Sequence, residues 1–281
     1  MISCYSRFLA ECGLPIFGLK DTNGKVIHLG RTFASRSIII WITKFLLVAF
    51  AISGMTLDIL GQATPEFYLA FFTNWGEVIG TTYLILSFMT SVGCIPVKSK
   101  EDKHGITIIA WTTKILWGLF PAIIVSQTVI VLVYWLTVYS GDTIYYTTLY
   151  GHGLLFAAIA MDGLILNRTP LRMKQIIFPY LIAAPYAAWS ILHGVATDLG
   201  NPNRTGGEET EEDDDALYGV LNWTERPVTA AIVLTILLGA AVPIFFVLFW
   251  SISLILPRRY VSNEEQDLDV DDSTDVFHDE V

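Results

Sequence analysis

The sequence predicts an all-α integral membrane protein with six transmembrane helices and both termini in the cytosol. Hydrophobic residues make up 53% of the 281 residues, charged residues make up only 16%, and the mean hydropathy is +0.53. A chain this apolar is typical of membrane proteins and not of soluble domains. Apolar runs of about 20 residues, the length that a helix needs to cross a bilayer, also recur along the chain.

Six runs are long enough to form such helices: Ile38–Leu57, Trp75–Val97, Leu116–Tyr139, Thr148–Leu166, Ile176–Thr197 and Val228–Leu256. The runs are apolar at successive positions, whereas the strands of a membrane barrel alternate polar and apolar residues over about 10 positions. Lys44 lies inside the first run, but a long Lys side chain can carry its ammonium group to the membrane surface. Helices are therefore expected throughout.

The Lys and Arg residues predict the orientation of these helices. They gather before the first run, between the second and third, between the fourth and fifth, and after the sixth, while the other three loops hold only Arg204 and Arg226. By the positive-inside rule, both termini lie in the cytosol. The N-terminus lacks the apolar core of a cleaved signal peptide, so the first run is expected to direct the chain to the endoplasmic reticulum or plasma membrane.

This topology divides the chain into three parts. We expect a cytosolic N-terminal segment over residues 1–35, a six-helix domain over 36–257 and an acidic, disordered cytosolic tail over 258–281. The net charge of −10 comes largely from this tail and from an acidic loop at about 200–216, which is also expected to be disordered. Asn203 and Asn222 open N-glycosylation sequons in the non-cytosolic loop, and Asn167 opens one on the cytosolic side, where it should stay unmodified.

The motifs of soluble enzymes are missing from the sequence. It contains no phosphate-binding loop, no dinucleotide-binding glycine motif and no H-E-x-x-H metal motif, and its three cysteines do not have metal-ligand spacing. We expect no metal, no cofactor and no nucleic-acid partner. Any chemistry must come from polar side chains within the helices, where membrane lipids are the available substrates and partners.

The expected topology sorts these polar side chains into two layers. An inner layer in the cytosolic half contains Asp162, Lys44 and Lys114, and we interpret it as a buried carboxylate paired with an ammonium group. An outer layer in the opposite half contains Thr73, Asn74, Glu77, His152 and His193. A hydroxyl group needs an adjacent base to act as a nucleophile, and an imidazole is the usual base near neutral pH, so Thr73 and His152 are a candidate pair.

Two other interpretations of the outer layer stay open. Thr and His side chains at helix ends are commonly satisfied by backbone groups or lipid headgroups. His152 and His193 share a leaflet in this topology and could instead hold a haem.

Four sequence blocks carry a resemblance to a known family. The block FFTNWGEVIGTTYLILSF resembles the opening of the second core span in the rolling stone family of membrane proteins. That family is similar to the androgen-induced integral-membrane hydrolases, which cleave fatty acid esters of hydroxy fatty acids. The blocks LYGHGLLFAAIAMDGLILNRTPLR, YAAWSILHGV and LYGVLNW follow in the family's order, so the resemblance covers roughly residues 36 to 256.

The resemblance implies a hydrolase of fatty acyl esters in which Thr73 is the nucleophile and His152 the base. The shared depth of the outer layer, and not the resemblance, suggests Asn74 or His193 as the group that stabilises the oxyanion. Glu77, one helical turn from Thr73, could orient His152 or point to the lipid headgroups. The chain has Gly219 where the family usually has Pro, and Asn222 near the position of an acidic residue. The rolling stone branch is associated with myoblast fusion, so the alternative is a non-catalytic protein that acts in adhesion, fusion or scaffolding.

Overall fold

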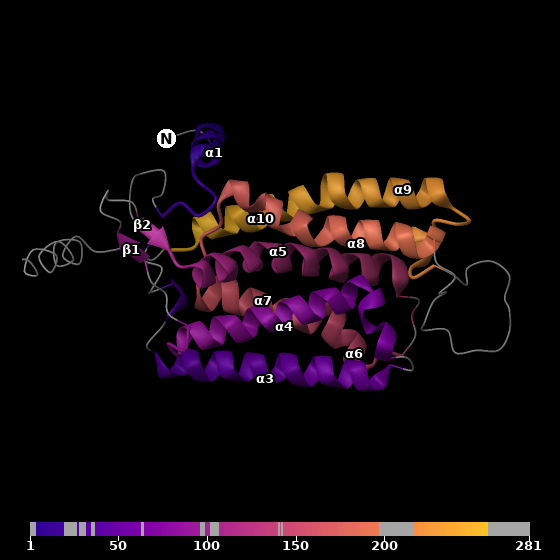
Figure 1. Ribbon diagram of the computed structural model, residues 1–281, viewed down its shortest axis with the longest axis horizontal. Helices are drawn as coiled ribbons and strands as arrows, with labels where there is room; N and C mark the ends of the chain where they lie inside the picture. The colour runs from indigo at the N-terminus through magenta and orange to yellow at the C-terminus, as the bar shows by residue number, and fades with distance from the viewer. Residues whose placement is uncertain are drawn as a thin grey trace, which may run out of the picture.

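Long helices run side by side along the longest axis of the molecule in the computed structural model (Figure 1). The structure describes residues 4–19, 27, 32–34, 37–62, 65–95, 99–101, 107–139, 141, 143–196 and 216–257. The predicted C-terminal tail, most of the predicted acidic loop and Asn203 lie outside the described residues.

The elements follow one another with short connections. The α-helices are α1 (Cys4–Gly13), α3 (Ile38–Gly61), α4 (Phe72–Ser91), α5 (Trp111–Val133), α6 (Tyr146–Leu149), α7 (Leu155–Ala160), α8 (Ile177–Ala196), α9 (Pro227–Ile236) and α10 (Val242–Ile255). Strands β1 (Ser99–Glu101) and β2 (Thr107–Ile109) pair antiparallel between α4 and α5. Short 3-10 helices cover Pro65–Ala70, Met173–Ile176 and Gly219–Leu221.

Within the described residues, five helical stretches are long and apolar enough to cross a membrane, which is consistent with a multi-pass membrane protein. They are Ile38–Gly61, Trp111–Val138, Tyr146–Leu166, Met173–Ala196 and Pro227–Ile255. The remaining predicted run also forms a helix, α4, which covers Phe72–Ser91 and not Trp75–Val97. Its N-terminal half carries Thr73, Asn74 and Glu77, so it is more polar than the other five stretches.

π-helical turns interrupt several of the long helices, and the sequence did not predict them. They cover Tyr134–Val138, Tyr150–Leu154, Met161–Leu166 and Leu237–Ala241. Within the second turn, His152 has a non-helical backbone, with φ −110° and ψ 24°. Because π turns inside α-helices occur frequently at functional sites, the turn Tyr150–Leu154 points to the surroundings of His152.

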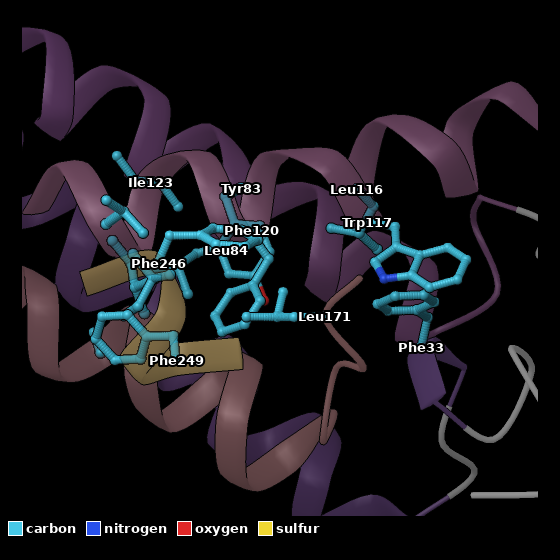
Figure 2. Packing of buried hydrophobic residues seen from close by; sticks show 14 of the residues in the cluster. Phe33, Tyr83, Leu84, Leu116, Trp117, Phe120, Ile123, Leu171, Phe246 and Phe249 are labelled. Atoms are coloured by element: carbon cyan, nitrogen blue, oxygen red, sulfur yellow. The ribbon is translucent and has the colours of Figure 1, made fainter. Parts of the chain in front are cut away.

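The helix α5 lies in the middle of the bundle, and 72% of its span is buried, compared with 17% of α3. It packs against α4 and α7 on one side and against α8 and α10 on the other, and α3 covers the outer side of α4 (Figure 1). Figure 2 shows the core that results, in which Tyr83 and Leu84 of α4 lie beside Phe120 of α5 and Phe246 of α10, while Trp117 of α5 lies against Phe33.

The helix α3 has the surface pattern expected of a helix that faces lipid. Its exposed side chains are large and apolar, such as Ile39, which is 72% exposed, and Phe45, which is 56% exposed. Its inward side buries Lys44 together with Val48 and Ala51. A soluble protein avoids large exposed apolar patches, so this arrangement suits a helix surrounded by hydrocarbon.

Two glycines allow the helices around the π turns to approach closely. A Cβ atom on Gly54 of α3 would overlap the ring of Tyr150, and one on Gly163 would overlap the ring of Phe120. The Tyr150 hydroxyl also donates a hydrogen bond of 2.8 Å to the carbonyl oxygen of Ala51. Small residues at such contacts are a common feature of packing between membrane helices. These contacts hold the turn Tyr150–Leu154 firmly against α3.

Candidate functional site

A polar cavity of about 260 Å³ lies where α3, α4 and the π turn Tyr150–Leu154 meet. Its lining includes two carboxylates, Asp58 and Glu77, together with hydroxyl, amide and imidazole groups. The lining residues are Asp58, Gln62, Phe71, Thr73, Asn74, Glu77, Tyr134, Val138, Thr147, Thr148, Gly151, His152, Leu217 and Tyr218.

An apolar cavity of about 90 Å³ lies beside the polar one, between α5, α8 and α9. Aliphatic side chains of these helices, such as Val129, Ala183 and Leu234, make up most of its wall. Thr73, Tyr134, Val138, His152 and Tyr218 line both cavities. The predicted nucleophile and base therefore share the boundary between an apolar and a polar space.

Thr73 lies in the first turn of α4 and is 9% exposed. The two residues that follow it hold the preceding 3-10 helix against this turn. The Asn74 side-chain amide donates a hydrogen bond of 2.5 Å to the carbonyl oxygen of Tyr68, and the indole of Trp75 donates one of 2.7 Å to that of Leu69. The side-chain amide of Asn74 and the indole of Trp75 thus fix the first turn of α4, which carries the hydroxyl group of Thr73. Asn74 therefore has a structural role.

His152 is held by its ring and by its backbone. Its imidazole stacks on the ring of Tyr134, with 3.6 Å between ring centroids and 3° between the planes, and its carbonyl oxygen accepts a hydrogen bond of 2.7 Å from the Trp135 indole. Among the described residues, its Nδ1 atom has no hydrogen-bond partner. The imidazole thus has a defined orientation, and its ring lies in the wall of both cavities.

Glu77 lies one turn after Thr73 and is 1% exposed. Its Oε2 atom accepts a hydrogen bond of 2.7 Å from the hydroxyl of Tyr68. Burial raises the pKa of Tyr68 well above its ordinary value, and the neighbouring Glu77 carboxylate raises it further, so this phenol stays protonated and remains a donor. The other carboxylate oxygen faces Gly151, next to His152 in the chain.

His193 is not brought to the two cavities. It is 3% exposed and packs on Trp189, with 5.5 Å between the ring centroids. Ser190, one turn earlier on α8, lines the apolar cavity in its place. The structure thus gives no support to His193 as an oxyanion donor or as a second haem ligand. Within the described ranges, no group of three or more His, Cys, Asp or Glu side chains could hold a metal ion.

Tyr218 is a site residue that our sequence reasoning missed. Its hydroxyl oxygen accepts a hydrogen bond of 3.0 Å from the backbone amide of Phe72, and Tyr218 shares the walls of both cavities with Thr73. The ring of Tyr218 packs edge-on against Phe71, with 5.9 Å between the centroids. The block LYGVLNW was the available signal, because it contains this tyrosine.

The inner polar layer forms around Asp162. The Lys44 ammonium lies 3.2 Å from one oxygen of the Asp162 carboxylate, and it donates hydrogen bonds of 2.7 Å to Ser87 Oγ and to Asn167 Oδ1. Ser87 and Asn167 donate to the other oxygen of Asp162, at 2.7 and 2.8 Å. Lys114 lies elsewhere, with its ammonium 5.9 Å from the ring centroid of Trp111. The ion pair of Asp162 is thus with Lys44.

Asn222 is 4% exposed, in contrast to the accessible glycan acceptor that we predicted. Its side-chain oxygen accepts hydrogen bonds from the backbone amides of Thr224 and Glu225, at 3.1 and 2.9 Å. The side chain therefore stabilises the turn before α9, which is a common role of Asn.

The chain matches no protein-family model, no curated protein and no solved structure. Its function has to be inferred from the geometry of the two cavities.

Proposed function

We propose that this chain is a multi-pass membrane hydrolase that cleaves a fatty acyl ester, with Thr73 as nucleophile and His152 as base. The observation that carries the proposal is that both residues line both cavities. Thr73 begins α4 and His152 lies in a π turn of another helix, so tertiary packing brings them to one boundary. An imidazole beside a hydroxyl group is the arrangement that activates a weak nucleophile.

The two cavities suit the two halves of an ester. The apolar cavity, bordered by Val129, Ala183 and Leu234, would receive the acyl chain. The polar cavity, with Asp58, Glu77 and Thr148 in its wall, would receive the alcohol and the hydrolytic water. The scissile carbonyl carbon would then lie at the boundary, next to Thr73 and His152.

The reaction would take two steps. The Thr73 oxygen attacks the carbonyl carbon while His152 takes its proton, and the tetrahedral intermediate collapses to an acyl-threonine as His152 returns that proton to the departing alcohol. Water then attacks the acyl-threonine with His152 again as base, and this step releases the fatty acid and restores Thr73.

The remaining predictions on topology belong to the same proposal. We propose that α4 is the sixth span, that both termini are cytosolic and that the protein resides in the endoplasmic reticulum or plasma membrane as a glycoprotein. The five long apolar stretches within the described residues and the lipid-facing pattern of α3 support the location in a membrane. The resemblance to the androgen-induced hydrolases points to the proposed activity, whereas the rolling stone branch points to the non-catalytic alternative.

Labelling and turnover of the detergent-purified protein test the proposal. A fluorophosphonate with a long alkyl chain should attach to Thr73, and the protein should hydrolyse members of a panel of lipid esters. Thr73→Ala, His152→Ala and the double variant should lose similar activity, each more than the roughly 10²–10⁴-fold of a single acid-base group, since the two groups act as one unit.

Thr82→Ala is the matched control, because this exposed threonine of α4 bonds only to the carbonyl oxygen of Val78, at 2.7 Å. It should keep its activity and its labelling. Folded Thr73→Ala protein with undiminished hydrolysis would contradict the assignment of the nucleophile. A wild-type protein that neither hydrolyses an ester nor takes the label would favour the non-catalytic alternative.

A further inference from the structure

Tyr218 connects a distant loop to the candidate nucleophile. The segment Ala216–Trp223 lies across the N-terminus of α4, and Tyr218 is one of the residues that line both cavities. The N-cap residue of α4, Phe71, makes no side-chain cap. The Tyr218 hydroxyl takes that position, because it accepts a hydrogen bond of 3.0 Å from the amide of Phe72, the first residue of the helix.

The hydrogen bonds that the Tyr218 hydroxyl accepts show whether its own proton can be donated to another group. A tyrosine hydroxyl has two lone pairs and one proton. Here the backbone amide of Phe72 donates to the oxygen of Tyr218 and uses one lone pair. This contact leaves the proton of Tyr218 available for donation to an acceptor in the cavities, whose shared wall also contains Thr73.

The other neighbouring oxygen belongs to Tyr186. Its hydroxyl donates a hydrogen bond of 3.0 Å to the carbonyl oxygen of Ala70, so the proton of Tyr186 is already in use. A carbonyl oxygen bound beside Thr73 could accept the proton of Tyr218.

We propose that Tyr218 is a further catalytic residue, whose hydroxyl donates a hydrogen bond to the carbonyl oxygen of the ester as that oxygen becomes negative. This inference rests on the function proposed above. When Thr73 attacks, its proton passes to His152, the new C–O bond forms, and the carbonyl electron pair moves onto the oxygen that Tyr218 contacts. When the tetrahedral intermediate collapses, this electron pair re-forms the carbonyl double bond and the bond to the alcohol breaks, while His152 returns the proton to the departing alcohol. Tyr218 keeps its own proton throughout.

The environment of the phenol supports this role. Burial raises the pKa of Tyr218 above its ordinary value, while the hydrogen bonds with Thr73 and Phe72 lower it in part. The hydroxyl is therefore protonated at neutral pH and remains a hydrogen-bond donor. A donor that is already in place before the reaction needs no reorganisation when charge develops, which is the origin of oxyanion stabilisation.

Tyr218→Phe tests the proposal, because it removes only the hydroxyl group. With a long-chain acyl p-nitrophenyl ester as substrate, we expect kcat to fall about 10²–10³-fold, as on removal of one oxyanion donor, with KM changed less than about threefold. Tyr180→Phe is the matched control. Its hydroxyl donates a hydrogen bond of 2.7 Å to the carbonyl oxygen of Leu238, which borders the apolar cavity, but Tyr180 itself lines neither cavity. This variant should therefore keep its kcat.

A pair of inhibitors separates catalysis from a purely structural role. A long-chain alkyl trifluoromethyl ketone forms a tetrahedral adduct with an oxyanion, whereas the corresponding methyl ketone does not. Tyr218→Phe should lose affinity for the fluorinated ketone by about the factor lost in kcat, and it should bind the methyl ketone like the wild type.

Three results would overturn the inference. An unchanged kcat in Tyr218→Phe would show that the phenol only caps α4. An equal loss of affinity for both ketones, together with a lower melting temperature, would assign the hydroxyl to folding alone. A wild-type protein that neither turns over the ester nor takes the fluorophosphonate at Thr73 would remove the proposed function itself, and this result is distinct from the other two.

Discussion

At the scale of single residues, Gly151 lies where the π turn that carries His152 contacts the start of α4, which carries Thr73, the proposed nucleophile. It precedes His152 in the π turn and lies directly against α4. A Cβ atom at this position would lie 2.6 Å from Glu77 Oε1 and 3.2 Å from Thr73 Cγ2, closer than side chains normally pack. Gly153, two residues later in the same turn, faces open space, since its nearest atom would be Leu149 Cδ1 at 3.9 Å.

This difference predicts that two similar substitutions have different effects. Gly151→Ala should push Glu77 and Thr73 away from His152 and lower turnover by about 10²-fold, the cost of misplacing reacting groups by about 1 Å. Gly153→Ala should keep nearly full activity. The measurement is ester hydrolysis by both folded proteins, and equal rates would show that the contact at Gly151 does not position the site.

At the scale of elements, two kinds of contact hold the helices around the site in register. The hydroxyl of Tyr150 and the small Gly54 join α3 to the π turn Tyr150–Leu154. Toward the other end of the bundle, Lys44, Ser87 and Asp162 join α3, α4 and the π turn Met161–Leu166 by an ion pair and hydrogen bonds. Substitutions in this inner network should therefore destabilise the bundle without changing the groups that line the cavities.

Asp162→Ala should lower the stability of the detergent-extracted protein by about 3–5 kcal/mol, because it leaves the buried Lys44 ammonium without its carboxylate. Lys44→Met in the same chain should recover part of this loss, since an uncharged side chain needs no partner. Thermal or denaturant unfolding of the single and double variants measures the coupling.

Lys114→Met is the control for this cycle, because Lys114 lies over Trp111 and apart from Asp162. Its effect on unfolding should be small and should add to that of Asp162→Ala. Additive losses for Asp162 and Lys44 would mean that their ion pair does not contribute to stability.

At the scale of the whole molecule, the basic loop before α8 lies at one end of the bundle. Arg172 pairs with Glu11 of α1 at 3.4 Å and donates a hydrogen bond of 2.7 Å to the carbonyl oxygen of Gly18. This contact places the loop before α8 at the same end as α1 and the two strands (Figure 1). Thr73 begins its helix at the opposite end, beside the 3-10 helices Pro65–Ala70 and Gly219–Leu221. The site would then face the lumen or the cell exterior.

Glycosylation tests this orientation. If the loop that contains Asn203 is lumenal or extracellular, glycosidase treatment should shift the electrophoretic mobility of the wild type and not that of Asn203→Gln. The burial of Asn222 leads us to expect little glycan there, so Asn222→Gln should keep the shift. A shift that depends on Asn167 would invert the orientation of the bundle.

The sequence determined the helical class and the approximate extent of each long helix, because hydropathy and run length are local properties of the chain. The predicted runs correspond to α3, α4, α5, α8 and the two interrupted helices, with ends that differ by a few residues. The polar character of the α4 start and of the segment around His152 was also visible, and it directed attention to Thr73 and His152.

Only the tertiary structure decided which side chains meet, since that depends on how each helix is rotated about its axis and on where π turns shift the register. The same depth in the membrane was predicted for Lys44 and Lys114, but packing turns Lys44 toward Asp162. Packing likewise buries His193 away from the cavities and brings Tyr218 from a distant loop to the first turn of α4. A rotation of about 100° per residue separates neighbouring positions on a helix, so depth alone cannot select one face.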